Sequence, residues 1–108
     1  MVEIKAGVEL DGAVAEAAGY DATIYYSHDL EKNVCLLLPS EESFSPSVDL
    51  NCAFAAAERA GVFLELNCLP DGWMATTHAM RGKSPAVEST PALAICAVIL
   101  ELSKAGNL

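Results

Sequence analysis

Three consecutive residues, Ser27-His28-Asp29, carry the side-chain types of a hydrolase triad and are the first candidates for chemistry in this chain. A catalytic triad requires the serine hydroxyl, the imidazole and the carboxylate to converge in space. Side chains of adjacent residues point in different directions, so triads are assembled from distant segments. We therefore predict a structural role for this trio, no enzymatic activity and no cofactor.

A second candidate is the basic loop that contains Arg81 and Lys83, two of the six basic residues. With the nearby Trp73 and His78, and with backbone N–H groups where a helix begins at Pro91, this loop could hold a phosphate. It lacks the G-x-x-x-x-G-K-[ST] pattern of a P-loop. A flexible hairpin loop is the simpler interpretation. Binding of a small nucleotide-like ligand by Trp73, His78, Arg81 and Lys83 is kept as the alternative.

Acidic residues outnumber basic ones by 15 to 6, and the excess is concentrated in the first half of the chain. Residues 1–50 hold ten acids and two bases, whereas residues 51–108 hold five acids and four bases. A net charge of −9 repels nucleic acid and attracts basic protein surfaces. The simpler interpretation of these acids is that they lie in a solvated loop and at the start of a helix, where negative charge is stabilising. If they form a partner-binding surface instead, the candidate residues are Glu41, Glu42, Asp49, Asp29 and Glu31.

The four cysteines, at positions 35, 52, 68 and 96, form no C-x-x-C pair and have no histidine at ligand spacing. Zinc sites usually contain closely spaced ligand pairs, so no metal is predicted. The N-terminal residues do not resemble a secretory signal, and we expect reduced thiols. Cys52, Cys68 and Cys96 lie within apolar segments and are predicted to be small core residues.

Periodicity and capping signals indicate the helices that position these residues. Apolar residues at three- and four-residue steps predict helices over about 4–18 and 48–60, each followed by a glycine. Ser47 or Asp49 is expected to cap the second helix, whose buried stripe is predicted to be Leu50, Phe54 and Ala57. Thr90 is predicted to cap a last helix over about 91–104, with Pro91 in its first position. This helix is apolar nearly all round, which predicts burial on several sides and a homodimer.

Strands are expected in the second half of the chain. Alternating residues predict a hairpin over 62–80 that turns at Pro70–Gly72, with a short third strand at 86–89. Residues 20–47 contain two β-prone runs, for which loop and short edge strand both remain open. The chain is therefore expected to form one domain, residues 1–108, of the α+β class, with helices packed on a small antiparallel sheet.

Several short motifs occur in an order that resembles a known family. They are Leu10-Asp11 with Ala13-Val14-Ala15 and Gly19, Phe44-Ser-Pro-Ser47 with Asp49, a Gly72-Trp73 hairpin, and Thr90-Pro91 with Cys96 in the last helix. Together they are similar to the phage ABA sandwich domain family of small phage and prophage proteins. The resemblance implies an α/β/α sandwich and a gene that travels with bacteriophage, and it carries no catalytic residues. This chain departs from the family in its acidity and in its apolar last helix.

Charge and resemblance together predict a phage-encoded, non-enzymatic accessory protein in the host bacterial cytoplasm. We expect it to act as a counter-defence inhibitor that binds a bacterial, nucleic-acid-handling protein through an acidic surface. No direct contact with nucleic acid is expected. No apolar run is long enough to span a membrane. The alternatives are a sequestering protein for a nucleotide-like ligand and an enzyme of unknown reaction.

Overall fold

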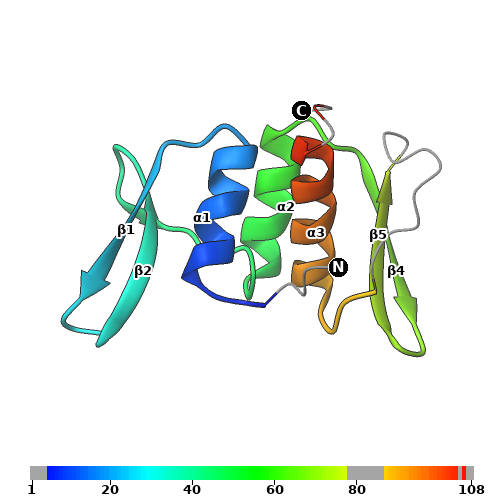
Figure 1. The fold of residues 1–108 in the computed structure, drawn as a ribbon, viewed down its shortest axis with the longest axis horizontal. Helices are drawn as coiled ribbons and strands as arrows, with labels where there is room; N and C mark the ends of the chain where they lie inside the picture. Colours follow the sequence, from blue (N-terminus) through cyan, green and yellow to red (C-terminus); the bar gives the residue numbers. More distant parts are fainter. Residues whose placement is uncertain (1–4, 78–86, 105, 107–108) are drawn as a thin grey trace.

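Three helices form the middle of the molecule, and a small antiparallel sheet lies at each end (Figure 1). The computed structural model describes residues 5–77, 87–104 and 106. Sheet A contains three strands, in the order β1-β2-β3, and sheet B contains two, β4 and β5. The elements are α1 (Val8–Ala17), β1 (Ala22–Ser27), β2 (Lys32–Leu37), β3 (Glu42–Ser43), α2 (Leu50–Arg59), β4 (Leu64–Leu69), β5 (Gly72–Thr77) and α3 (Pro91–Lys104).

The predicted α+β class, with helices packed on a small antiparallel sheet, is confirmed, although there are two such sheets instead of one. The α/β/α layer order that the resemblance implied is wrong: the helices form the middle layer between two sheets, because the two halves of the chain each contribute a separate hairpin instead of sharing one sheet. Sheet A packs against α1, and sheet B packs against α3. The three helices start at the same end of their layer (Figure 1). The long dimension of the molecule, 43 Å, runs from one sheet to the other.

Helices α1 and α2 end in the same way. After α1, the N–H groups of Gly19 and Tyr20 donate to the carbonyls of Glu16 and Ala15, at 3.1 and 2.9 Å. After α2, the N–H groups of Gly61 and Val62 donate to Glu58 and Ala57 at the same two distances. Both glycines have positive φ, 85° and 74°, as this C-terminal motif requires. The glycine stops predicted from the sequence are confirmed.

These shared ends belong to a repeat of the whole unit of helix and hairpin. Helix α2 begins 42 residues after α1, at Leu50 and Val8, and β4 begins 42 residues after β1, at Leu64 and Ala22. The corresponding helices and strands have equal lengths, ten and six residues. A fixed spacing of this size is typical of repeated supersecondary units. Positions in one unit can therefore serve as controls for the other.

The helix starts follow the predicted caps, apart from the first. Asp49 caps α2 by accepting from the N–H groups of Asn51 and Cys52, and the Thr90 hydroxyl accepts from Leu93 N–H at 3.2 Å. The prediction that the first helix begins near residue 4 is wrong for residues 5–7, since α1 begins at Val8. The backbone of Gly7 is held instead by the Ser47 hydroxyl, which accepts from its N–H at 3.1 Å.

Helix α3 forms the centre of the core. Every residue from Ala92 to Ile99 is buried, because α1, α2 and β5 all contact this helix. Its apolar faces are covered within one chain, so they no longer provide a reason for dimerisation. The homodimer itself stays a prediction, which light scattering at micromolar concentration can test.

Two predictions about buried residues are wrong. Phe54 is 44% exposed, and the buried residues of α2 are Ala53, Ala56 and Ala57. Small side chains let α2 approach α3 closely, so the larger ring lies outside this contact. Cys68 is exposed near the hairpin turn, whereas Cys96 and Cys35 are buried.

Asp11 is a buried acid that joins the starts of α1 and α2. Its Oδ1 accepts from the backbone N–H of Ser47 at 2.8 Å, and its exposed fraction is 6%. Burial raises the pKa of Asp11 above its usual value of 3.8, while the hydrogen bonds from Ser47 act in the opposite direction. The ionised carboxylate is thus disfavoured in the folded state relative to the unfolded chain.

Replacing Asp11 with asparagine is expected to change how stability depends on pH. A raised folded-state pKa means that the native protein binds more protons than the unfolded chain, so stability falls as pH rises from below 3.8 through that pKa. The amide of the D11N variant would keep an acceptor for Ser47 N–H without this loss. Urea unfolding of both proteins should give a stability difference that moves in favour of D11N as pH rises and then levels off. A pH-independent difference would contradict this assignment.

Candidate functional site

Four of the five predicted partner-binding acids lie at the two turns of sheet A. Asp29 and Glu31 occupy the β1–β2 turn, while Glu41 and Glu42 lie where β2 leads into β3. All four are exposed. Glu31 and Glu41 have positive φ, 53° and 60°, because each completes a tight turn. The six-residue strand β2 separates the two acidic turns by about 20 Å.

Asp49 does not belong to this group. It lies at the start of α2, in the helix layer, where its Oδ1 accepts from Asn51 N–H at 2.9 Å. A carboxylate in this position satisfies helix N–H groups and favours the positive end of the helix dipole. We therefore assign Asp49 to helix capping.

Between the acidic turns, the outer face of sheet A carries three apolar residues, Tyr25, Val34 and Leu36, together with Thr23 and, at its β1–β2 end, the exposed base Lys32. Tyr25 lies opposite Val34 on the neighbouring strand, and Thr23 lies opposite Leu36. The next residues along β2, Cys35 and Leu37, belong to the core, so alternation directs Val34 and Leu36 away from the helices. Tyr25 is 47% exposed. We call this surface the acid-rimmed face: Tyr25, Val34 and Leu36, with Asp29, Glu31, Glu41 and Glu42 at its ends.

Sheet B provides a contrast. Its outer face pairs Glu65 with Thr76 and Asn67 with Met74, so it is mostly polar, as expected for a sheet with one solvated face. The outer face of sheet A has the larger apolar part, Tyr25, Val34 and Leu36, although Thr23 and Lys32 share this face. An apolar sheet face with a polar rim is the usual composition of a protein–protein interface.

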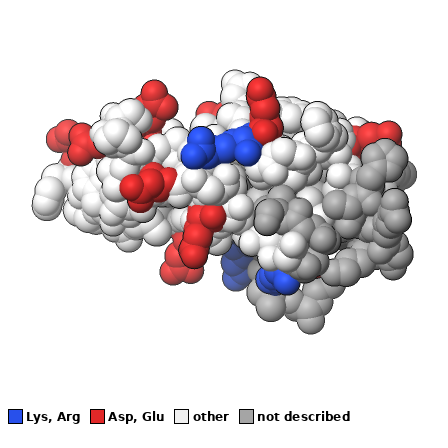
Figure 2. Space-filling view, turned by 90° about the horizontal axis from the view of Figure 1, so that it is seen from above, with Lys and Arg blue, Asp and Glu red and all other residues white. Residues whose placement is uncertain are grey.

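Charge also distinguishes the end of the molecule that contains sheet A. Residues 21–43, which include sheet A, contain five acids and one base, Lys32. Seen from above the helix layer, the end of the molecule that sheet A forms shows acidic groups and no basic group (Figure 2). Asp21, an acid outside the predicted partner-binding set, is exposed, and its carbonyl accepts from Leu38 N–H at 2.8 Å beside the β2–β3 turn. It adds a further acid at this end of the sheet.

The Ser27-His28-Asp29 trio forms part of a turn. The Ser27 hydroxyl accepts from Leu30 N–H at 3.3 Å and so closes the β1–β2 connection. His28 is exposed, and its ring meets Tyr26 edge-on with 5.3 Å between centroids. These contacts give Ser27 and His28 the structural roles that the sequence predicted.

The alternative ligand site falls mainly on residues that the structure does not describe. His78, Arg81 and Lys83 lie outside the described residues, which leaves Trp73. Its N–H and C=O both bond to Glu88, at 2.7 and 2.9 Å, and its side chain is half-buried against the core. Glu88, the partner of Trp73 in this bridge, lies within the predicted third strand.

All four cysteines are free thiols, and their environments differ. Burial raises the pKa of Cys96 to about 12, and the nearby Asp11 carboxylate adds to this shift. The pKa of Cys35 is also raised, chiefly by burial. Since the thiolate is the reactive species, both groups should react slowly.

We expect iodoacetamide to modify the exposed Cys68 first in the native protein, followed by the half-buried Cys52. Cys35 and Cys96 should react only after denaturation. Mass spectrometry without reductant should show one or two additions in buffer and four in urea. Equal native rates at all four sites, or fewer than four additions in urea, would contradict this prediction.

Comparison with known proteins identifies no relative. No protein-family model matches the chain, no curated protein matches it, and no solved structure is significantly similar. Among the described residues, no helix is long and apolar enough to cross a membrane. Function is therefore inferred from the surface of the chain itself.

Proposed function

We propose that this chain is a phage-encoded, non-enzymatic accessory protein that binds a basic protein of the bacterial host through its acid-rimmed face. The partner belongs to the host's nucleic-acid-handling or defence machinery, and the protein acts in the host cytoplasm as a counter-defence inhibitor. The observation that carries the proposal is the cluster of Tyr25, Val34 and Leu36 on the outer face of sheet A, between two acidic turns.

The composition of this face favours a protein partner. Tyr25, near the middle of the pair β1–β2, offers a large amphipathic ring of the kind that anchors interfaces. The surrounding carboxylates would attract a surface rich in lysine and arginine and accelerate association. Proteins that hold nucleic acid carry such basic surfaces, so occupation of that surface would exclude the nucleic acid.

The same charges disfavour two other occupants of this face. Nucleic acid would bring phosphates against carboxylates. A second copy, docked face to face about a two-fold axis, would bring acidic turns together at both ends of the sheet. A basic partner is the occupant that the charge favours.

Affinity capture from bacterial lysate tests the proposal. Immobilised wild-type protein should retain a protein with a basic surface at low salt and release it at high salt, since exposed charges are screened. A Tyr25→Ser variant should retain much less of it, and a Thr76→Ser variant on the outer face of sheet B should retain the same amount. Retention that is equal for all three proteins, or indifferent to salt, would refute the assignment of the face.

A further inference from the structure

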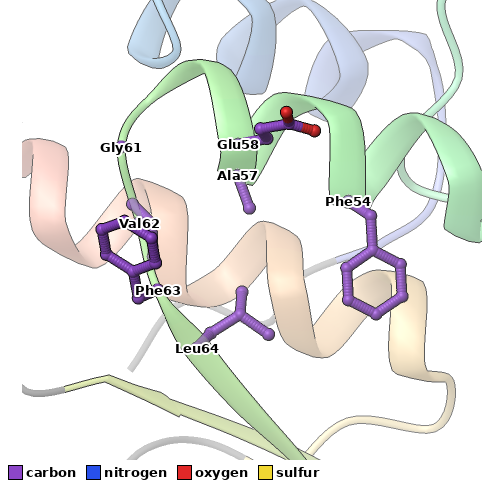
Figure 3. A pocket seen from close by; sticks show the side chains of 7 residues that line it. All are labelled: Phe54, Ala57, Glu58, Gly61, Val62, Phe63 and Leu64. Carbon is purple, nitrogen blue, oxygen red and sulfur yellow. The ribbon is translucent and has the colours of Figure 1, made fainter.

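A groove lies between α2 and the start of β4, and none of its lining residues belongs to the acid-rimmed face. It encloses about 400 Å³ and is lined by seven residues: Phe54, Ala57, Glu58, Gly61, Val62, Phe63 and Leu64. Phe54 and Phe63 lie on its two sides, Ala57 and Leu64 lie between them, and Glu58 stands at its upper edge (Figure 3). The groove thus combines two aromatic rings with one carboxylate.

The backbone fixes the exposed position of Phe63. The hydrogen bonds of Gly61 and Val62 to the end of α2 hold the segment that enters β4. Val62 and Leu64 pack against the core, so strand alternation turns the residue between them outward. Phe63 is 86% exposed, the highest value for a large apolar side chain among the described residues. The ring is therefore presented to solvent by a well-bonded segment.

The carboxylate of the groove is not matched by a base within it. Glu58 is the one charged residue of the lining. Arg59, its neighbour in sequence, is directed elsewhere: its Nη2 donates to Gly19 O at 3.0 Å, and its guanidinium lies 4.5 Å from the Tyr20 ring centroid. The groove therefore presents a negative charge beside two aromatic rings.

We propose that this groove binds the side chain of an arginine or lysine presented by another protein. The alkyl part of such a side chain would cover Ala57 and Leu64. Its cationic head would reach the Glu58 carboxylate at the upper edge, with the Phe54 and Phe63 rings on the two sides of the bound side chain. Neither an anion nor a purely apolar group would use all of these contacts.

A second copy of the chain is a poorer occupant. Symmetrical docking of two Phe63 rings would also bring two Glu58 side chains together without a base between them. The groove contains none of the residues of the acid-rimmed face, and the proposal does not depend on that face. A peptide probe can therefore test the groove alone.

The test is an NMR titration of the ¹⁵N-labelled chain with acetyl-Gly-Arg-Gly-amide, and with the same peptide carrying neutral citrulline. We expect the arginine peptide to shift the backbone amides of Glu58, Phe63 and Leu64. The citrulline peptide should bind at least about threefold more weakly, given the usual strength of exposed cation–π and ionic contacts. Equal binding of the two peptides would overturn the proposal.

Single substitutions test which side chains of the groove contact the arginine peptide. Glu58→Gln and Phe63→Ser should each weaken the arginine peptide about three- to fivefold, whereas Glu16→Gln should leave its binding unchanged. Glu16 is the matched control because it holds the position in α1 that Glu58 holds in α2, three residues before the terminal glycine. An equal effect of E16Q and E58Q would show unspecific attraction and reject the site. If the same amide signals shift when only the protein concentration is raised, the groove binds a second copy of the chain instead.

Discussion

Alanine in place of Gly72 is expected to destabilise the fold by about 2–6 kcal/mol. Gly72 has a φ of 146°, and an added Cβ would collide with the carbonyl oxygen of Glu88. The strained backbone contributes about 1–3 kcal/mol. Displacing Glu88 would also break its two backbone hydrogen bonds with Trp73, each worth about 0.5–1.5 kcal/mol. Urea unfolding followed by the fluorescence of Trp73, the single tryptophan, measures this loss.

Gly61→Ala is the matched control. Gly61 also has positive φ, 74°, but nothing lies within 4 Å of an added Cβ. Its replacement should cost about 1–2 kcal/mol, the usual penalty for a side chain in the left-handed region. Equal losses in G72A and G61A would show that the contact with Glu88 does not matter. A G72A protein as stable as the wild type would contradict the close contact between Gly72 and Glu88.

Neutralising the rim of the acid-rimmed face should slow association with the captured partner by about tenfold or more. The variant carries Asp29→Asn with Glu31, Glu41 and Glu42 all changed to Gln. These side chains are exposed, so stability should change little, and relief of mutual repulsion favours the fold. Surface plasmon resonance at several salt concentrations should show a reduced on-rate and a flatter salt dependence, with a smaller change in the off-rate.

A second variant removes four exposed acids elsewhere, by changing Glu9, Glu16, Glu65 and Glu101 to Gln. It has the same net charge as the rim variant, so it separates local contacts from the overall field. Its on-rate should fall less than that of the rim variant. If both variants associate equally slowly, net charge alone drives binding and the rim has no special role.

Much of the helical part of this fold could be predicted from sequence, because caps and stops are local. Asp49 and Thr90 satisfy the first N–H groups of their helices, and Gly19 and Gly61 take the left-handed conformation after them. These signals depend on a few consecutive residues. They do not depend on what the helix packs against.

The burial of particular side chains was less predictable, since it depends on the neighbour. Phe54 and Ala57 fall on one apolar stripe of α2. Because α2 packs closely on α3, only the small Ala57 side chain is buried in the contact, and the Phe54 ring remains exposed. The two β-prone runs of residues 20–47 have apolar residues on both faces, so alternation alone does not say which face is inside. Their register shows that Cys35 points inward and Val34 outward.

The candidate sites also combine features that are visible in the sequence with features that depend on the fold. The acids were visible in the sequence, but their division between the two ends of β2 required the strand pairing. Tyr25 was missed for the same reason. Phe63 carried a signal that could have been used: alternation places it with Glu65 and Asn67, on the face opposite Leu64. A phenylalanine on the polar face of a strand predicts a contact outside the domain.

Site-specific cross-linking tests the central claim most directly. A photoreactive benzoylphenylalanine is placed at position 25 on the outer face of sheet A, or at position 76 on the outer face of sheet B, and each protein is irradiated in bacterial lysate at low and high salt. We predict a covalent adduct from position 25 at low salt, with a partner whose cross-linked peptide lies in a lysine- and arginine-rich, nucleic-acid-binding surface. Position 76 should give no such adduct. Adducts from position 76 alone, or a partner peptide from an acidic surface, would contradict the proposed role of the acid-rimmed face.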